Sequence, residues 1–394
     1  MKILILGFSK TGRAVYDFIQ KNGKNEIYIY DKNKIKIRNY ISYNELKKRL
    51  PHFDLVIRSP GIKMTSKVYQ LALILGNKLV SEIEYALKYI KDNKVIGVTG
   101  SNGKTTLVKM IENKLKGKYR VHVLGNIGTP LISQIGNIKK EDIVILELSS
   151  FQLENTYSKY FDIGVITNIT DNHFDHVFTK ECYYASKLKL IDLSKTIYMS
   201  NSIKYHRKKK KVIYIEDLPV IENKELNYFN QIYWNIACSI ARKFHVDDNV
   251  LLDNNHFNME PFRTQFIKEY KKLIFINDSK STSIASCNGC LNIYKDKPRI
   301  IILGGISKKE NFSTIHKNKD DYVLSFGKDK IKIFRQIGDL YFDNLNLLMK
   351  YIKKHFINKE YYVIFSPACA SFDQFSSYLD RGEKFNRLVS EYFS

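Results

Sequence analysis

The sequence has 394 residues, of which 44 % are hydrophobic and 26 % charged, and this globular composition excludes a disordered or collagen-like chain. Lys and Arg outnumber Asp and Glu by 64 to 40, but the cations are spread along the chain. We therefore expect a phosphate-rich ligand and compositional drift, and no nucleic-acid partner. No run approaches the ~18 apolar residues of a membrane span, and the start Met1–Gly7 lacks a secretory cleavage site, so we expect a cytoplasmic protein.

The first ninety residues alternate strand and helix patterns, which indicates a parallel sheet with helices on both faces. Three strands and one helix are predicted, at Lys2–Gly7, Glu26–Asp31, Leu55–Arg58 and, for the helix, Gly12–Asn22. The turn from Gly7 to Gly12 keeps the outer glycines of G-x-G-x-x-G but has Ser9 in the middle, and Asp31 follows at the distance of a ribose contact. It is a weak dinucleotide fingerprint but a reasonable phosphate-binding turn.

A second unit begins with a strand at Lys94–Thr99, which runs into a glycine-rich loop. Four more apolar runs predict further strands, at Val121–Leu124, Ile143–Leu146, Ile163–Thr167 and Thr196–Met199. The segment 203–230 is interpreted as irregular, and its basic run 206–211 as a solvated loop. A helix is predicted at Trp234–Lys243.

A third unit begins near Phe262. Its strands are predicted at Leu273–Asn277, Arg299–Leu303, Tyr322–Ser325 and Tyr362–Ser366, with helices between them. The fold class is therefore α/β, with domains expected at 1–87, 88–261 and 262–394. Five Cys in so long a chain argue against a disulfide framework, and the C-x-x-C pair Cys287 and Cys290 lacks a second pair for a zinc site, so we expect reduced, partly buried thiols.

The strongest local motif is T-G-S-N-G-K-T-T at residues 99–106, between a predicted strand and a predicted helix. Backbone N–H groups of a glycine-rich loop at a helix N-terminus bind phosphate. Lys104 would reach the outer phosphates and the Thr105 hydroxyl would bind Mg²⁺. Val98 stands where the strict pattern has Gly, but the strand–loop–helix context is right. We predict an ATP-phosphate site made of Gly100, Ser101, Asn102, Gly103, Lys104, Thr105 and Thr106.

This loop has the form found in the Mur ligases of peptidoglycan synthesis, and further segments resemble that family. They are Gly125–Pro130, Glu147–Glu154, Asn168–His176, Asn277–Lys280, Leu303–Gly305, Ser366–Phe375 and Arg381–Gly382. The resemblance covers nearly the whole chain. Within it, E-L-S-S-F-Q-L-E at 147–154 and S-P-A-C-A-S at 366–371 resemble the member that adds D-glutamate and separate it from its sister ligases.

The resemblance implies three domains: a Rossmann-like N-terminal domain for a UDP-linked substrate, a P-loop ATPase-like central domain with a parallel sheet, and a Rossmann-like C-terminal domain for the amino acid. It implies a ligase that uses ATP to convert the carboxylate of UDP-MurNAc-L-Ala into an acyl phosphate, which the amine of D-glutamate attacks. The implied cofactors are ATP, Mg²⁺ at two sites, and CO₂ bound as a lysine carbamate. The implied partners are these small substrates, and the expected oligomeric state is a monomer.

The resemblance also implies catalytic and metal-binding roles. The catalytic residues are Lys104, Glu147, His173 and Lys187, and the metal ligands are Thr105, Glu147, His173 and Lys187. Glu147 ends a predicted buried strand, where a lone carboxylate is costly unless it meets a cation. Lys187 matches the carbamylated lysine of the family, which needs a depressed amine pKa; Lys189 is a neighbouring alternative.

Three substrate-binding sets follow from the same resemblance. ATP would also contact Asn235, Arg263 and Asp278. The family pattern G-x-H-N-x-x-N around Asn235 is only partly kept, because residues 229–235 read F-N-Q-I-Y-W-N. The UDP-linked substrate would meet Ser9, Lys10, Thr11, Asp31, Lys32, Ser59, Gly61 and Asn126. D-Glutamate would meet Lys280, Thr282, Lys308, Ser371 and Tyr378, the last replacing a Phe of the family.

Two alternatives stay open. One is a sister Mur or folylpolyglutamate-type ligase that adds another amino acid, against which the signature at 366–375 argues. The other is a non-catalytic, basic nucleotide-binding protein that uses its charge of +24 as a scaffold or nucleic-acid binder. The chain is also shorter than usual for this ligase and departs from the family pattern around 203–235 and 254–265. Binding to a polyanion would collapse between about 50 and 200 mM salt, whereas turnover that depends on D-glutamate would persist.

Overall fold

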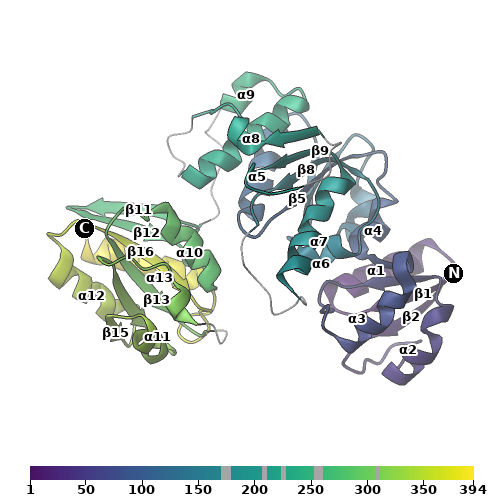
Figure 1. The fold of residues 1–394 in the computed structure, drawn as a ribbon, viewed down its shortest axis with the longest axis horizontal. Coiled ribbons are helices and arrows are strands. Elements are labelled where there is room, and N and C mark those ends of the chain that lie inside the picture. The colour runs from purple at the N-terminus through teal and green to yellow at the C-terminus, as the bar shows by residue number, and fades with distance from the viewer. Residues whose placement is uncertain (170–178, 206–210, 223–227, 253–260, 308–310) are drawn as a thin grey trace. The chain divides into compact units, whose positions relative to one another are not determined.

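The computed structural model describes the whole chain except residues 170–178, 206–210, 223–227, 253–260 and 308–310. It contains three sheets, each with helices packed on its faces, which confirms the predicted α/β class (Figure 1). The chain packs into two compact units, Met1–Phe257 and Asn258–Ser394. The first unit holds two of the sheets and the second unit holds the third; the boundaries expected at 87/88 and 261/262 stay predictions.

The first sheet has four parallel strands in the order β2-β1-β3-β4. Its strands are β1 (Lys2–Leu6), β2 (Glu26–Tyr30), β3 (Leu55–Arg58) and β4 (Leu79–Ser81), and its helices are α1 (Lys10–Asn22), α2 (Tyr43–Arg49), α3 (Lys67–Ala72) and α4 (Glu82–Leu87). Apolar strand residues such as Leu4 and Ile5 are fully buried, so both faces of the sheet are covered. The three strands and the first helix that were predicted here are confirmed.

The second sheet has six parallel strands in the order β10-β9-β8-β5-β7-β6. They are β5 (Lys94–Thr99), β6 (Val121–Gly125), β7 (Ile143–Glu147), β8 (Phe161–Ile166), β9 (Ser194–Met199) and β10 (Lys211–Tyr214). The helices are α5 (Lys104–Leu115), α6 (Ser150–Glu154), α7 (Lys180–Leu193), α8 (Tyr228–Lys243) and α9 (Asp248–Leu252). One cluster of buried side chains runs from β1 through α4 to β5 and β7, so the first two sheets share a core.

Two predictions for the second sheet are wrong in detail. The segment 203–230 is not irregular throughout, because Lys211–Tyr214 pairs with β9 as an edge strand. The sequence V-I-Y favours a strand, but the basic run before it suggested a loop. Lys211, the last cation of that run, belongs to β10, and residues 206–210 lie outside the described part of the chain. Helix α8 begins at Tyr228, six residues before the predicted start.

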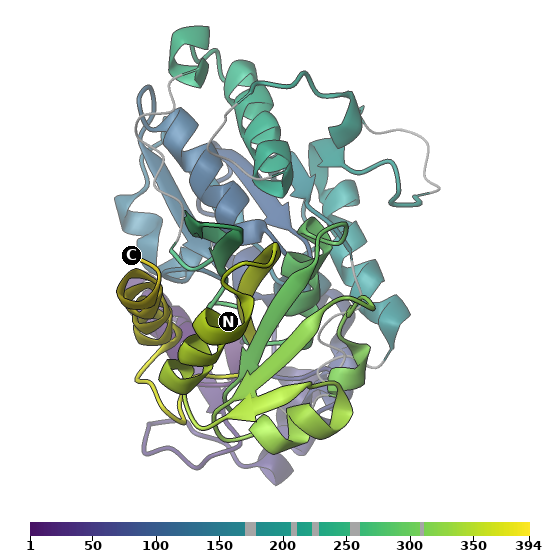
Figure 2. The same ribbon diagram turned by 90° about the vertical axis from the view of Figure 1, so that its left-hand side faces the viewer.

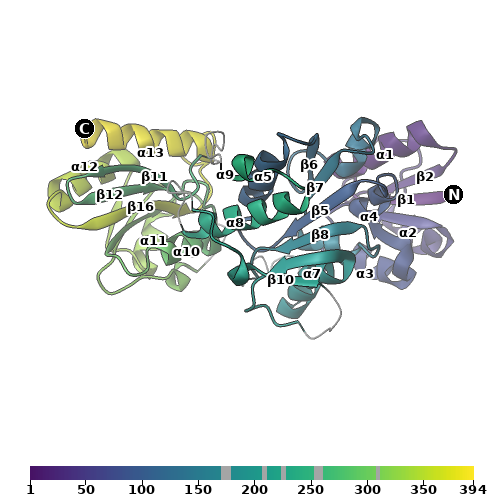
Figure 3. The same ribbon diagram turned by 90° about the horizontal axis from the view of Figure 1, so that it is seen from above.

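The third sheet has six strands in the order β11-β12-β16-β13-β14-β15. They are β11 (Gln265–Tyr270), β12 (Leu273–Asn277), β13 (Arg299–Gly304), β14 (Tyr322–Phe326), β15 (Leu340–Phe342) and β16 (Tyr361–Ala368), and only β11 runs antiparallel to its neighbour. The helices are α10 (Ile284–Ile293), α11 (Lys330–Gln336), α12 (Leu345–Phe356) and α13 (Tyr378–Tyr392). Helices α12 and α13 cover one face of this sheet, and α10 and α11 cover the other (Figures 2 and 3). A cluster of buried apolar side chains fills the space under each pair.

Short 3₁₀ turns complete the described secondary structure, at Leu50–His52, Leu73–Lys78, Leu131–Asn137, Ile215–Asp217 and Phe312–Thr314. All five cysteines are free thiols, as expected, and four of them are buried. Cys287 and Cys290, both on α10, are buried in the core, and burial raises the pKa of Cys290 well above its usual value. No helix among the described residues is long and apolar enough to span a membrane.

Candidate active site

The phosphate loop joins β5 to α5 and requires glycine at two positions. Gly100 has φ +149° and Gly103, which caps α5, has φ +78°. A Cβ on Gly100 would lie 1.9 Å from the Thr167 hydroxyl, and one on Gly103 would lie 2.0 Å from the hydroxyl of Tyr233. The backbone N–H of Ser101 donates to the Asn168 carbonyl at 2.9 Å, so the loop is also tied to the end of β8. The glycines therefore permit a close approach that no other residue allows.

The side-chain nitrogens of two lysines converge on the carbonyl of Gly100. Lys104 Nζ, from the first turn of α5, donates to it at 2.8 Å, and Lys187 Nζ, from α7, donates to it at 2.7 Å. Lys187 is only 2 % exposed. Burial and the charge of Lys104 hold the pKa of Lys187 well below its usual value, while Glu147 opposes this shift. The site thus favours an uncharged amine on Lys187.

The neighbouring alternative, Lys189, faces another environment. Its Nζ donates to the backbone carbonyl of Glu154 at 2.6 Å and lies 4.5 Å from the centre of the Tyr157 ring. Burial lowers the pKa of Lys189 as well. Of the two lysines, only Lys187 contacts the phosphate loop in the contacts described here.

Glu147 ends β7 beside this loop and is 3 % exposed. The Thr105 hydroxyl donates to its Oε2 at 2.8 Å, and the Asn126 side-chain amide donates to its Oε1 at 2.9 Å. A carboxylate beside a hydroxyl offers the hard oxygen ligands that Mg²⁺ prefers, so these residues fit that ion. His173 lies outside the described residues, and within the described part no group of three His, Cys, Asp or Glu side chains forms a metal cluster.

The glycine-rich turn after β1 brings several predicted UDP-site residues together. A Cβ on Gly12 would lie 2.0 Å from the Gly7 carbonyl, so α1 packs directly on the turn. The Ser59 hydroxyl donates to the same carbonyl at 2.7 Å. Asp31, at the end of β2, accepts from the backbone N–H of Phe8 at 2.7 Å. These contacts gather the turn, Asp31 and Ser59 at the carboxyl edge of the first sheet, where open α/β folds bind ligands.

The other predicted UDP-site residues border this edge. Ser9, Lys10, Lys32 and Gly61 are exposed, and Thr11 is half-buried in the first turn of α1. Lys10 Nζ donates to the Gly128 carbonyl at 2.5 Å. Because Gly128 follows Asn126 in the same loop, this bond links the turn to the surroundings of Glu147.

Helix α8 turns Tyr233, which sequence reasoning missed, toward the phosphate loop. Its hydroxyl packs against Gly103 and lies 3.5 Å from the Asn168 amide nitrogen. The predicted Asn235 uses its Oδ1 to accept from the backbone N–H of Ile221 at 3.1 Å and from the Gln231 amide at 2.9 Å. Residues two apart on a helix do not share a face, so Asn235 is directed away from the loop. An adenine contact for Asn235 stays a prediction.

In the second unit, Asp278 is the centre of a buried network at the carboxyl edge of the third sheet. It accepts from the hydroxyls of Ser281 at 2.5 Å and Ser366 at 2.7 Å, and from the backbone N–H of Thr264 at 3.1 Å. Burial raises its pKa, and these hydrogen bonds oppose the rise. Because Thr264 follows Arg263, the two predicted ATP residues of this unit lie close together.

Arg381 is a second residue whose role sequence reasoning missed. It is fully buried, and its guanidinium donates to the Ser279 hydroxyl at 3.0 Å, to the Ser279 carbonyl at 2.7 Å and to the Cys369 carbonyl at 2.9 Å. It thereby joins the segment after β12 to the segment after β16. Burial lowers its pKa to about 10, so the group stays charged at neutral pH.

The predicted D-glutamate residues lie around these joined segments. Lys280 follows Ser279, and its Nζ lies 5.2 Å from the centre of the Tyr378 ring. Ser371 is buried two residues after Cys369, and Thr282 is half-buried just before α10. Lys308 lies outside the described residues.

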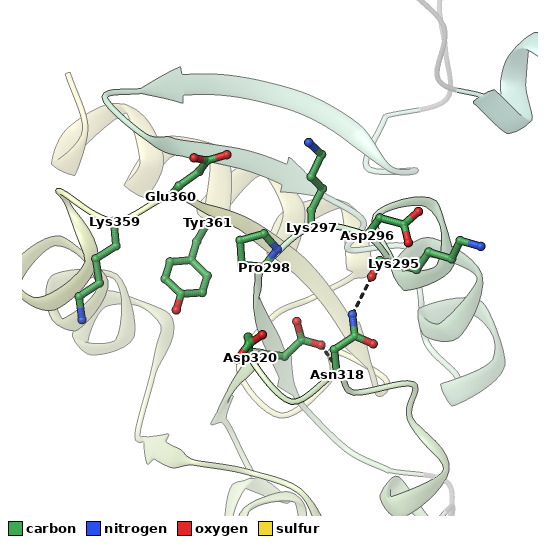
Figure 4. Close-up of a pocket in the computed structure, with 10 residues that line it drawn as sticks. Lys295, Asp296, Lys297, Pro298, Asn318, Asp320, Lys359, Glu360 and Tyr361 are labelled. Carbon is green, nitrogen blue, oxygen red and sulfur yellow. Dashed lines mark hydrogen bonds between the residues drawn. The ribbon is translucent and has the colours of Figure 1, made fainter.

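A pocket of about 620 Å³ lies at the other edge of the third sheet, at the amino ends of β13, β14 and β16 (Figure 4). It is lined by Lys295, Asp296, Lys297, Pro298, Asn318, Asp320, Asp321, Lys359, Glu360 and Tyr361. Because ligands of open α/β sheets bind at the carboxyl edge, and none of the predicted residues lines this pocket, it is not the predicted site.

Comparison with known proteins agrees with this geometry. The family model "Mur ligase middle domain" matches residues 98–231, which contain the phosphate loop and Glu147. A UDP-N-acetylmuramoylalanine–D-glutamate ligase of Francisella tularensis subsp. tularensis is 34 % identical over 99 % of this chain and 96 % of its own length. The chain belongs to the Mur ligase family. A homologous ligase of F. tularensis subsp. novicida is 33 % identical with the same coverage.

Solved structures of a Mur ligase and of a pseudomurein peptide ligase share the fold. The MurF ligase of Thermotoga maritima, solved in complex with ADP, has a TM-score of 0.60 at 16 % identity and covers 99 % of this chain and 95 % of its own. A pseudomurein peptide ligase from Methanothermus fervidus has a TM-score of 0.54 at 17 % identity and covers 99 % of both chains. The three-sheet architecture expected of a Mur ligase is thus confirmed.

Proposed function

We propose that this Mur ligase joins D-glutamate to UDP-N-acetylmuramoyl-L-alanine with hydrolysis of ATP, as a step of peptidoglycan synthesis. The observation that carries the proposal is the 34 % identity to a D-glutamate ligase over 99 % of this chain. A shared fold alone would not select among amino acids, since functions differ on one fold. The end-to-end match, together with the motif at 366–371, favours D-glutamate. We also propose that the chain acts as a monomer in the cytoplasm.

In the proposed reaction the triphosphate of ATP lies on the loop 100–106, with the positive end of α5 and the charge of Lys104 against it. The substrate carboxylate attacks the γ-phosphorus, a new O–P bond forms, and ADP leaves. Glu147 and Thr105 would hold Mg²⁺, which neutralises phosphate charge when it is bound. A second metal is proposed to use His173 and a carbamate on Lys187, which needs the uncharged amine that its burial favours.

The amine of D-glutamate then attacks the acyl carbon, and phosphate leaves as the amide forms. Its two carboxylates need cations and hydroxyls, which we assign to Lys280, Thr282, Lys308, Ser371 and Tyr378. Arg263 and Asp278, with Asn235, are proposed for the nucleoside of ATP. Asn126 is proposed for the sugar–peptide part of the other substrate. Because its amide also holds Glu147, substrate and metal ligands would share one scaffold.

Phosphate release from ATP tests this proposal. The full chain would be supplied with UDP-N-acetylmuramoyl-L-alanine, Mg²⁺ and bicarbonate, and then with D-glutamate, L-glutamate, L-lysine or no amino acid. Release that depends on D-glutamate and is lost in Lys104→Met supports the proposal. Release with another amino acid would assign a sister activity instead, and no release under any condition would favour the scaffold.

A further inference from the structure

Arg58, at the end of β3, joins the first two sheets through a buried cluster. Its side chain is only 1 % exposed, and its Nη1 donates to Glu154 Oε2 at 2.6 Å and to Asn155 Oδ1 at 2.8 Å. The guanidinium lies 4.2 Å from the centre of the Tyr69 ring, and the Tyr69 hydroxyl donates to the other oxygen of Glu154. Burial and this bond to Glu154 raise the pKa of Tyr69 far above its usual range. Every member of the cluster is thus held by another member.

The same guanidinium also shapes the loop that follows it. Its Nε and Nη2 donate to the Ile62 carbonyl at 3.0 and 2.6 Å. The loop between them contains Ser59 and Gly61, which are assigned above to the UDP-linked substrate. One side chain therefore closes this loop on one side and holds Glu154 on the other.

Glu154 is the last residue of α6, and the first residue of that helix lies three positions after Glu147. The start of α6 is fixed by a capping box, in which the Ser149 hydroxyl accepts from the Gln152 N–H and the Gln152 side chain accepts from the Ser149 N–H. Both ends of this short helix are therefore held by side-chain hydrogen bonds, so a shift of Glu154 would also shift the start of the helix. Arg58 is thus connected, through five helical residues, to the strand end that carries Glu147.

We propose that Arg58 is a positioning residue, which fixes the loop 59–62 relative to α6. Because this loop is assigned to the UDP-linked substrate, Arg58 thereby sets where the substrate carboxylate lies relative to the γ-phosphate of ATP. The inference rests on the proposed function. A buried ion pair adds little to stability by itself, because the desolvation of both charges offsets their attraction. The planar fork of arginine makes bonds in two directions at once, which a lysine ammonium does not reproduce.

The test compares Arg58→Lys with Arg299→Lys. Arg299 is a matched control, since it is equally buried and forms an ion pair with Asp321, but it lies in the other compact unit and away from every predicted site residue. We expect both variants to lose thermal stability. In Arg58→Lys alone, the KM for UDP-N-acetylmuramoyl-L-alanine should rise, and kcat should fall, by about tenfold or more, because a small misplacement of reacting groups is costly. The KM for ATP and for D-glutamate should stay within about twofold, since neither is assigned to the loop 59–62.

A double-mutant cycle and a binding measurement complete the test. Arg58→Met with Glu154→Leu should lose no more kcat/KM than Arg58→Met alone, because the two residues act as one unit. Calorimetric titration with the UDP-linked substrate should show weaker binding by Arg58→Lys, even if the wild-type chain has no ligase activity. Failure of the proposed function can therefore be distinguished from failure of this inference. Wild-type kinetics and binding in Arg58→Lys, or equal changes in both lysine variants, would overturn the inference, as would a wild-type chain that does not bind the UDP-linked substrate.

Discussion

Lys187 combines burial with a neighbouring cation, and both lower the pKa of its amine well below the usual value, which favours the uncharged form. An uncharged amine adds CO₂, whereas an ammonium does not, so the setting favours a carbamate. We expect a carbamate carbon signal in the NMR spectrum of the chain equilibrated with ¹³C-bicarbonate. The signal should disappear in Lys187→Arg, together with about 100-fold of the ligase activity. It should also disappear as the pH falls through the lowered pKa, because protonation then competes with CO₂.

Lys189→Arg is the matched control for this prediction. The two lysines lie on one helix and both have lowered pKa values, but Lys189 bonds to the Glu154 carbonyl and not to the phosphate loop. The variant should keep both the carbamate signal and the activity. Loss of the signal in Lys189→Arg with retention in Lys187→Arg would reverse the assignment.

Arg381 joins two backbone segments at the carboxyl edge of the third sheet, so its removal has a local and measurable cost. Arg381→Met leaves the carbonyls of Ser279 and Cys369 buried without these donors, at about 1–3 kcal/mol for each group. We expect the free energy of unfolding to fall by about 3 kcal/mol and the KM for D-glutamate to rise. Urea unfolding followed by circular dichroism measures the first effect, since the only Trp, Trp234, lies in the other unit. The exposed Arg387→Met, on the same helix, should change neither quantity.

The predicted residues that contact one another in the structure were identified from short sequence motifs. Thr105, Glu147 and Asn126 come from three separate motifs, and their side chains form one hydrogen-bonded group. Arg58, Tyr233 and Arg381 were assigned no role, because each acts through a partner 65 to 102 positions away. Only the folded chain shows such pairings.

The elements were predictable where apolar periodicity was strong and unopposed. Buried strands such as β7 and β13 read as continuous apolar runs, and their helices follow at regular spacing. Strand β10 was missed, because the basic run before it dominates the local composition. The start of α8 was missed because its first residues, Y-F-N-Q, include aromatic and Asn residues of low intrinsic helix propensity, so packing decides whether they are helical.

Helix α4 begins with a carboxyl group whose burial makes the folding free energy depend on pH. Glu82 is fully buried, and its described hydrogen bond is from the Ile132 N–H; burial raises its pKa to about 7. The folded chain therefore holds a proton that the unfolded chain releases near pH 4.5, so stability falls as the pH rises from about 4.5 to 7. Glu82→Gln keeps the acceptor without the charge. It should stabilise the first unit by about 1 kcal/mol at pH 5 and about 3 kcal/mol at pH 8.

Denaturant unfolding followed by Trp234 fluorescence checks this prediction, because Trp234 lies in the same compact unit as Glu82. The exposed Glu141→Gln provides the control and should show no gain that depends on pH. A constant difference between Glu82→Gln and the wild type from pH 5 to pH 8 would mean that Glu82 ionises normally in the folded chain.

At the scale of the whole molecule, part of the net charge of +24 follows Asp31, a residue of the predicted UDP site. After Asp31 the chain alternates cations and isoleucines: Lys34, Lys36 and Arg38 are exposed, while Ile35 and Ile37 pack against the core. Three exposed cations thus follow within seven residues of Asp31, which is assigned to a substrate that carries a diphosphate and a carboxylate. Attraction at this range is screened beyond a Debye length of about 10 Å at 0.1 M salt.

We therefore expect the association rate constant of the UDP-linked substrate to fall as the salt concentration rises. Replacing Lys34, Lys36 and Arg38 by Glu should lower that rate constant about tenfold at low salt and flatten its salt dependence, because steering acts mainly on association. Stopped-flow binding measures both effects. The same charge change at Lys350, Lys353 and Lys354, exposed cations of α12 in the other unit, is the control. If the two triple variants slow association equally, total charge and not the strip beside Asp31 attracts the substrate.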